Sequence, residues 1–233
     1  MSHRGYTPIA PENSLVSFEE AGKRKVRAIE TDVHFTKDKR MVCCHDSSTA
    51  RTYGEDLIIE ESSFNELQKL RIATGNRVEC YNDEQLRMPE FGEYLDICEH
   101  YGAVPFIETK GDAIIVKGVL DELKKRGIIK NCIISSIEFD HIEETRRLNS
   151  DVFIHHIFCP EERVPKIAQM GNCGLSYNYV NLDEVPENLI EGTHKAGVRV
   201  CLRAGDDAET VIRMMKMGLD YIPTNTMYKL PDR

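Results

Sequence analysis

The sequence predicts an α/β fold, a (β/α)8 TIM barrel with a small inserted subdomain after the second strand. Short apolar or β-branched runs alternate with amphipathic stretches, which is typical of strands and helices built around a parallel sheet. The repeating unit is roughly 20 to 25 residues long, and a glycine suited to capping a helix follows several amphipathic stretches. The length of 233 residues fits one such barrel.

Seven apolar runs are the strand candidates, at residues 27–33, 104–109, 132–136, 152–157, 173–177, 198–202 and 221–224. The helix patterns between them cover residues 113–126, 139–148, 164–170, 187–196 and 208–217. The glycines expected to end helices are Gly127, Gly171, Gly197 and Gly218. This order of elements predicts consecutive βα units.

A returning arm complicates the count of strands. Residues 32–36 and 41–45 are joined only by residues 37–40, which is too short for a parallel crossover, so they should form an antiparallel hairpin on the end of the second strand. Seven barrel strands then remain, and the segment 1–4 must supply the eighth. Only two residues precede His3, so this first strand should be nearly absent. The sequence leaves open whether a misplaced gene start or trimming has shortened it.

The long segment 46–101 is expected to be an insertion over the top of the barrel rather than a second domain. It follows a single strand candidate and contains its own helix patterns at 63–70 and 90–100, with a polar stretch near 74–84. We therefore expect one domain over residues 1–233, with this insertion inside it.

The bulk composition excludes several classes of protein. The net charge of −9 argues against a nucleic-acid partner, which would require a basic surface. No apolar run reaches the length of a membrane-spanning helix, and no signal-peptide pattern opens the chain. The eight cysteines form no Cys-x-x-Cys pair, and several lie in apolar runs, as expected for reduced, buried cysteines. We expect a cytoplasmic protein that is not stably inserted into a membrane. Whether it forms a homo-oligomer is left open by the sequence.

Two pairs of charged residues lie at strand candidates. Glu30 and Asp32 are two residues apart and share a face, where they would repel one another unless a hard cation such as Mg²⁺ or Ca²⁺ binds. Glu108 and Lys110 have the same spacing at a strand end, where barrel enzymes place their chemistry. Glu108 could complete a three-carboxylate metal site, and Lys110 could contact a phosphate oxygen. Each pair alone also fits an ordinary role, a solvated strand edge or a salt bridge.

Two histidines accompany these charges. His3, beside Arg4, lies at the expected end of the first strand, and His45 ends the returning arm of the hairpin. With the turn at 37–40, Asp32 would lie across from His45, which would bring this histidine to the carboxylates. Two histidines beside one metal suit phosphodiester cleavage, in which one removes a proton from the nucleophile and the other protonates the leaving alkoxide. The other six histidines are expected to be structural or surface residues.

Six short motifs combine these residues in a fixed order along the chain. They are His3-Arg4-Gly5, Pro11-Glu12-Asn13, Glu30-x-Asp32, Thr36-Lys37-Asp38, His45-Asp46 and Glu108-Thr109-Lys110. This order resembles the glycerophosphodiester phosphodiesterase family. The resemblance is specific between residues 3 and 110 and continues more weakly at residues 134–136, 197–198 and 218–224.

The resemblance implies a barrel with an inserted subdomain, a Mg²⁺ or Ca²⁺ ion, and hydrolysis of a small-molecule glycerophosphodiester to glycerol phosphate and an alcohol. By the same resemblance, the acid–base pair is His3 and His45, the metal ligands are Glu30, Asp32 and Glu108, and the phosphate contacts are Arg4 and Lys110. Two alternatives stay open: a phospholipase-like enzyme acting on lipid headgroups, and a non-catalytic phosphate-binding barrel. The absence of tryptophan counts mildly against the first, and two retained histidines count against the second.

The chain departs from the family pattern in its C-terminal half. Leu202-Arg203 stands where family members often have Trp-Thr, and Thr224-Asn225 stands where they have Thr-Asp. Both departures are expected on the substrate side of the site, away from the metal and histidine set. They would therefore change which alcohol is accepted.

Overall fold

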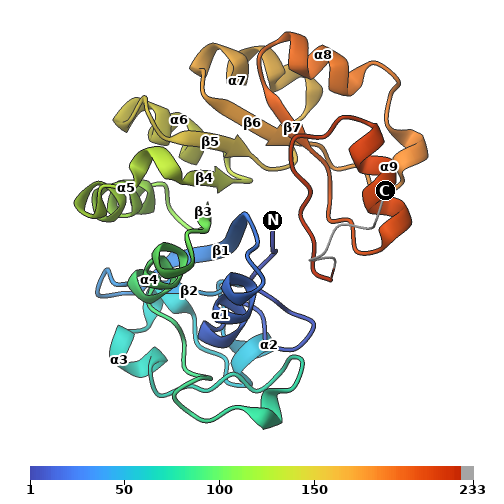
Figure 1. Ribbon diagram of the computed structural model, residues 1–233. Helices are drawn as coiled ribbons and strands as arrows, with labels where there is room; N and C mark the ends of the chain where they lie inside the picture. The colour runs from blue at the N-terminus through green and yellow to red at the C-terminus, as the bar shows by residue number, and fades with distance from the viewer. Residues whose placement is uncertain (227–233) are drawn as a thin grey trace.

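Six parallel strands and one antiparallel strand form a sheet in the computed structural model, which describes residues 1–226 (Figure 1). The sheet order is β2-β1-β3-β4-β5-β6-β7, and only the β1–β2 pair is antiparallel. The strands are β1 Ala28–Phe35, β2 Met41–Cys43, β3 Val104–Thr109, β4 Ile133–Ser136, β5 Phe153–His156, β6 Cys173–Ser176 and β7 Arg199–Cys201.

The first and last strands expected from the sequence are reduced to single bridges that close the barrel. Ser2 bridges Ile29 on β1 and Thr224 near the end of the described chain, both in parallel. The Asp220 amide in turn donates to the Val200 carbonyl of β7 at 3.0 Å. The predicted barrel is confirmed, although these two strands are shorter than expected. Local chemistry explains this: Pro223 has no N–H, and the chain turns sharply after His3.

Helices cover the outside of the strands, with one helix of seven or more residues in each crossover (Figure 1). They are α1 Leu15–Lys23, α4 Phe91–Tyr101, α5 Ile114–Arg126, α6 Phe139–Leu148, α7 Val164–Met170, α8 Leu189–Lys195 and α9 Ala208–Lys216. The 3-10 helices of this part are Ile129–Asn131, Glu161–Arg163 and Leu182–Glu184. None of the helices in the described part of the chain is long and apolar enough to cross a membrane.

The β1–β2 hairpin differs from its predicted register by one residue. Its turn has three residues rather than four, because the Thr36 amide bonds to the Arg40 carbonyl at 2.8 Å and Lys39 adopts a left-handed φ of 62°. The Cys44 amide therefore bonds to the Asp32 carbonyl at 3.0 Å. The expectation that His45 lies across from Asp32 is wrong, and His45 instead lies just beyond the end of β2.

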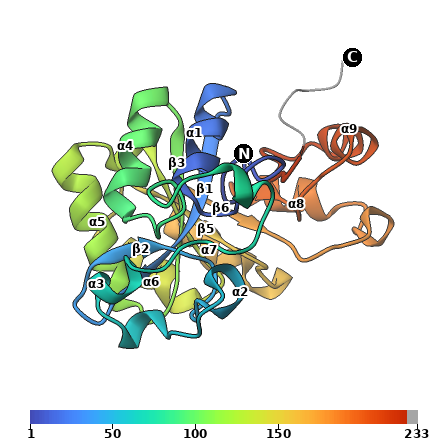
Figure 2. The same ribbon diagram turned by 90° about the horizontal axis from the view of Figure 1, so that it is seen from below.

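A small second core lies beside the hairpin, and its apolar side chains include Val42, Ile59, Leu67 and Met88. It is enclosed by α2 Ala50–Tyr53, α3 Phe64–Leu67 and the 3-10 helices Ile59–Glu61 and Val78–Cys80. Figure 2 shows α2 and α3 together on one side of the molecule. The following helix α4 packs against the main core through Phe91 and Leu95. The division into one domain with an insertion at 46–101 stays a prediction.

Candidate active site

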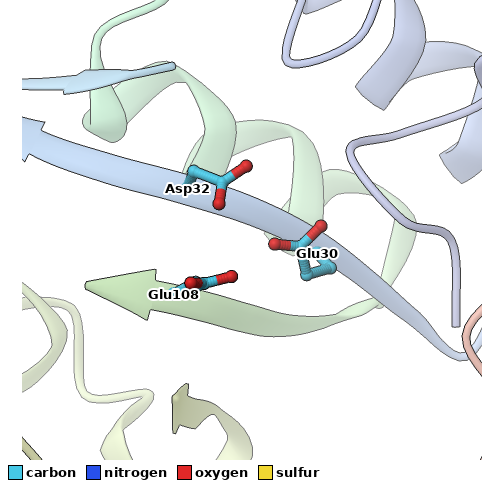
Figure 3. A group of neighbouring side chains, drawn as sticks. All are labelled: Glu30, Asp32 and Glu108. Carbon is cyan, nitrogen blue, oxygen red and sulfur yellow. The ribbon is translucent and has the colours of Figure 1, made fainter. Parts of the chain in front are cut away.

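Three carboxylates gather on the paired strands β1 and β3, with Glu30 and Asp32 within β1 and Glu108 near the C-terminal end of β3 (Figure 3). Glu30 and Asp32 share one face of β1, and the parallel register places Asp32 directly beside Glu108 of β3. Each of the three supplies an oxygen atom that lies within 4.8 Å of the others. All three side chains are buried, and Asp32 is 0 % exposed. The structure therefore brings together the three residues that the sequence predicts as metal ligands.

The proximity of these carboxylates changes their pKa values. Burial, followed by the charge of Asp32, raises the pKa values of Glu30 and Glu108 to about 8. Burial also acts to raise the pKa of Asp32, but the neighbouring cations Lys110 and Arg4 lower it to about 2. Three buried carboxylates can all ionise only if further positive charge lies between them.

The donor atoms fit a hard divalent cation. Oδ1 of Asp32 is buried and accepts no hydrogen bond of good geometry, although Nζ of Lys110 lies 3.1 Å away. Oδ2 of the same carboxylate accepts a hydrogen bond from the Asn13 amide at 2.9 Å and lies 3.5 Å from Nε of Arg4. The site thus offers three carboxylates with a free oxygen lone pair, the ligand type that Mg²⁺ and Ca²⁺ prefer.

The two predicted phosphate contacts flank the carboxylates. Lys110 bonds to Glu108, and Arg4 donates its backbone N–H to Glu30 at 2.8 Å. Arg4 and Gly5 have φ values of 57° and 85°, so the chain turns sharply after His3. A Cβ on Gly5 would lie 2.3 Å from Oγ of Ser17, so this close approach requires glycine. The turn aims the Arg4 guanidinium at the acidic cluster.

His3 is oriented by a residue from the other end of the described chain. Its Nδ1 lies 2.8 Å from Oδ1 of Asn225, whose own amide donates to Oδ2 of Asp206 at 2.7 Å. The expectation that the departure at Thr224-Asn225 stays away from the histidine set is therefore wrong. The reason is barrel closure, which places Thr224 beside Ser2 and so Asn225 beside His3.

His45 is held by a chain of charges that sequence reasoning did not identify. Its Nδ1 lies 2.6 Å from Oδ1 of Asp46, and Oδ2 of Asp46 lies 2.5 Å from Nε of Arg51. Arg51 also contacts Glu12 at 2.6 Å, and Glu12 contacts Arg4 at 3.1 Å. The only sequence signal for this chain of contacts was the position of Glu12 and Asp46 within the short motifs.

A cavity of about 330 Å³ opens in front of the carboxylates. Its charged wall consists of His3, Arg4, Glu30, His45, Glu108 and Lys110. Its apolar wall includes Ile137, Ile157, Phe158, Leu202 and Ala204, which follow β4, β5 and β7. The predicted catalytic, phosphate-contacting and metal-ligating residues thus surround one cavity, except that Asp32 lies behind its surface.

One of the histidines expected to be structural also lines this cavity. His155 on β5 is buried, and its Nδ1 is hydrogen-bonded to the hydroxyl of Tyr221. Burial, followed by the neighbouring His156, lowers the pKa of His155 to about 3. His155 is therefore a neutral part of the cavity wall.

Comparison with known proteins identifies the family of this chain. The family model described as the glycerophosphoryl diester phosphodiesterase family matches residues 3–229. A glycerophosphodiester phosphodiesterase of Caldanaerobacter subterraneus subsp. tengcongensis is 27% identical over 233 residues, which cover 97% of this chain and 93% of the relative. Glycerophosphodiester phosphodiesterase 1 of Mus musculus is 29% identical over 124 residues, which cover 53% of this chain and 37% of the relative.

Solved structures show the same fold. An Oleispira antarctica phosphodiesterase in complex with the product sn-glycerol-3-phosphate superposes with a TM-score of 0.85 at 20% identity, covering 98% of this chain and 93% of that one. A putative glycerophosphoryl diester phosphodiesterase of Silicibacter pomeroyi gives a TM-score of 0.82 at 23% identity, covering 97% and 89%. The family model matches almost the whole length of this chain. The chain is therefore a phosphoric diester hydrolase that belongs to the glycerophosphoryl diester phosphodiesterase family.

Proposed function

We propose that this chain hydrolyses glycerophosphodiesters to glycerol phosphate and an alcohol, with Mg²⁺ or Ca²⁺ held by Glu30, Asp32 and Glu108. The observation that carries the proposal is the buried cluster of these three carboxylates in one cavity with two histidines. When bound, the cation would neutralise charge that builds up on the phosphate oxygens in the transition state. The product bound in the Oleispira structure supports glycerol phosphate as the product class.

The two cationic side chains would bind the phosphate group. Arg4 and Lys110 both line the cavity and both lie next to Asp32, so a phosphate in front of the carboxylates would lie within their reach. Their positive charge favours an anionic substrate in spite of the net charge of −9. Each guanidinium or ammonium proton that is hydrogen-bonded to a phosphate oxygen would also orient the ester for attack.

The two histidines would divide the proton transfers. In each ring Nδ1 faces an oxygen acceptor, Asn225 for His3 and Asp46 for His45, which leaves Nε2 free to face the substrate. The Asp46 carboxylate accepts from Nδ1 of His45 and so would fix this ring with Nε2 directed to the leaving oxygen. We therefore assign His45 as the general acid and His3 as the general base. The attacking group is either a neighbouring hydroxyl of the glycerol, which gives a cyclic phosphate, or water.

The experiment that tests this proposal uses the purified protein with glycerophosphoserine and with glycerophosphoethanolamine, each with either Mg²⁺ or Ca²⁺. Phosphorus NMR should show glycerol phosphate as the product, and any cyclic intermediate would appear as a separate resonance. Parallel reactions should contain an intact phospholipid, which the phospholipase-like alternative requires. Absence of hydrolysis of any glycerophosphodiester with either metal would overturn the proposal, and binding of phosphate without turnover would favour a non-catalytic barrel.

The free cysteines favour a cytoplasmic site of action. Seven of the eight cysteines are free and buried, and Cys80 is free and exposed. Reduced cysteines of this kind are typical of a reducing compartment.

A further inference from the structure

The two walls of the cavity differ in charge. Of the described residues that line it, only Glu30 and Glu108 carry carboxylates, and both belong to the metal cluster on β1 and β3. The order of strands around the barrel places β7 four positions from β3 of eight, which is the opposite side. Of the lining residues that follow β7, Leu202 and Ala204 are apolar and Arg203 carries a positive charge.

Arg203 presents this charge without a carboxylate to neutralise it. It is exposed, and within residues 1–226 no carboxylate lies at ion-pairing distance from its guanidinium. The guanidinium carbon lies 5.3 Å from the centroid of the Phe158 ring, which also lines the cavity. A cation on an aromatic face is held in place while its N–H groups stay available to a ligand.

The backbone of Phe158, whose ring lies beneath the Arg203 guanidinium, is held in a strained conformation. Phe158 has a φ of 54°, in the left-handed region that bulky side chains rarely adopt. Ser176 at the end of β6 maintains this conformation, since its Oγ accepts the Phe158 amide at 3.1 Å and its carbonyl accepts the Cys159 amide at 2.8 Å. Strain of this kind persists where the surrounding structure holds it, and it is concentrated at functional sites. The strained turn keeps the Phe158 ring under Arg203.

A glycerophosphodiester has two substituents on its phosphorus, and the two walls match them differently. The hydroxyl-rich glycerol matches the charged wall, where histidine, arginine, lysine and carboxylate groups can satisfy its hydrogen bonds. The other substituent, the leaving alcohol, then points toward Ile157, Phe158, Leu202 and Arg203. A negative charge on this alcohol would be attracted to Arg203, with a strength limited by solvent at the exposed guanidinium.

Resting on the function proposed above, we infer that Arg203 selects substrates whose leaving alcohol carries an anionic group, a carboxylate or a phosphate. An alcohol that carries only an ammonium group, as ethanolamine and choline do, meets repulsion from Arg203 and finds no carboxylate on that wall. The selectivity thus depends on the single cation Arg203, which follows β7.

The matched substrates for the test are glycerophosphoserine and glycerophosphoethanolamine, because their leaving alcohols differ only by one carboxylate. The ratio of their kcat/KM values should favour the serine compound in the unaltered protein. Arg203→Met removes the charge and keeps the length, and it should lower that ratio about five-fold, the effect of one partly exposed ion pair. Arg203→Glu should invert the preference. Because every protein is assayed with the same two substrates, comparing the kcat/KM ratio between variants cancels the intrinsic difference in reactivity of the two leaving alcohols.

The matched control is Arg199→Met. Arg199 lies at the start of β7, the strand that precedes Arg203, and outside the cavity, with its guanidinium carbon 5.4 Å from the centroid of the Phe153 ring. The control removes the same charge and should leave the ratio unchanged. Hydrolysis of both substrates with equal ratios in the Arg203 variants and the unaltered protein would overturn this inference alone. Hydrolysis of neither substrate by the unaltered protein would overturn the proposed function, and this inference with it.

Discussion

The buried pair of His155 and Tyr221 should make the protein less stable in mild acid. The Tyr221 hydroxyl is hydrogen-bonded to Nδ1 of His155, and the Phe106 ring packs against the imidazole with the centroids 5.3 Å apart. Burial lowers the pKa of His155 to about 3, whereas the same group in the unfolded chain titrates near 6.5. Below about pH 6.5 the unfolded chain therefore binds a proton that the folded protein does not, so stability falls as the pH falls.

The magnitude follows from these two pKa values. Between pH 7 and pH 5 a single group that titrates at 6.5 only in the unfolded chain lowers the free energy of unfolding by about 2 kcal/mol. The loss continues at about 1.4 kcal/mol per pH unit until the pH approaches the folded pKa of about 3. For a chain of this size the change from pH 7 to pH 5 corresponds to a fall in Tm of about 4 to 8 °C.

The variant His155→Asn isolates this contribution. Its side-chain oxygen can accept the Tyr221 hydrogen bond but does not titrate. The variant should have a constant loss of stability from the smaller side chain, with a shallower dependence on pH. Urea unfolding at pH 7, 6 and 5 measures both. If the free energies of unfolding of the two proteins fall in parallel from pH 7 to pH 5, His155 is not a buried neutral histidine and the reasoning is wrong.

Three further predictions concern catalysis. Chelation should stop turnover with little change in circular dichroism, because the barrel core already holds the ligand strands, and full activity in excess chelator would remove the metal assignment. Asp32→Asn should weaken Mg²⁺ or Ca²⁺ binding in calorimetric titration, and unchanged affinity would make Asp32 a structural carboxylate. His3→Ala and His45→Ala should each lower kcat by about 10² to 10⁴-fold, with the double variant losing far less than the product. A nitrophenolate leaving group should rescue only His45→Ala, and equal losses on both substrate types would refute the division of roles.

The acidic cluster could be predicted from the sequence because it depends on local rules. The two-residue spacing of Glu30 and Asp32 places both on one strand face, and the end of the next parallel strand brings Glu108 beside Asp32. The same rules predict the order of barrel strands and the helices between them. The patterns that encode these features lie within single elements or between neighbours.

Features that depend on a single backbone conformation or on distant contacts could not be predicted. The hairpin register changed by one residue because Lys39 adopts a left-handed φ, which a lysine does not indicate. The pairing of His3 with Asn225 spans 222 positions and exists only in the closed barrel. The contact of Arg51 in α2 with Asp46 depends on how the short loop between them turns, and no periodicity encodes that turn.

Closure through Ser2 makes enzymatic activity a reporter of the last step of folding. The metal ligands lie on adjacent strands and can assemble once the first half of the chain has folded. The orientation of His3 requires Asn225, so it is reached only when the two ends of the described chain meet. Contacts of such long sequence separation form slowly and open early. A refolding chain should therefore regain cation binding before turnover, and under mild denaturation it should lose turnover while the carboxylate cluster is still intact.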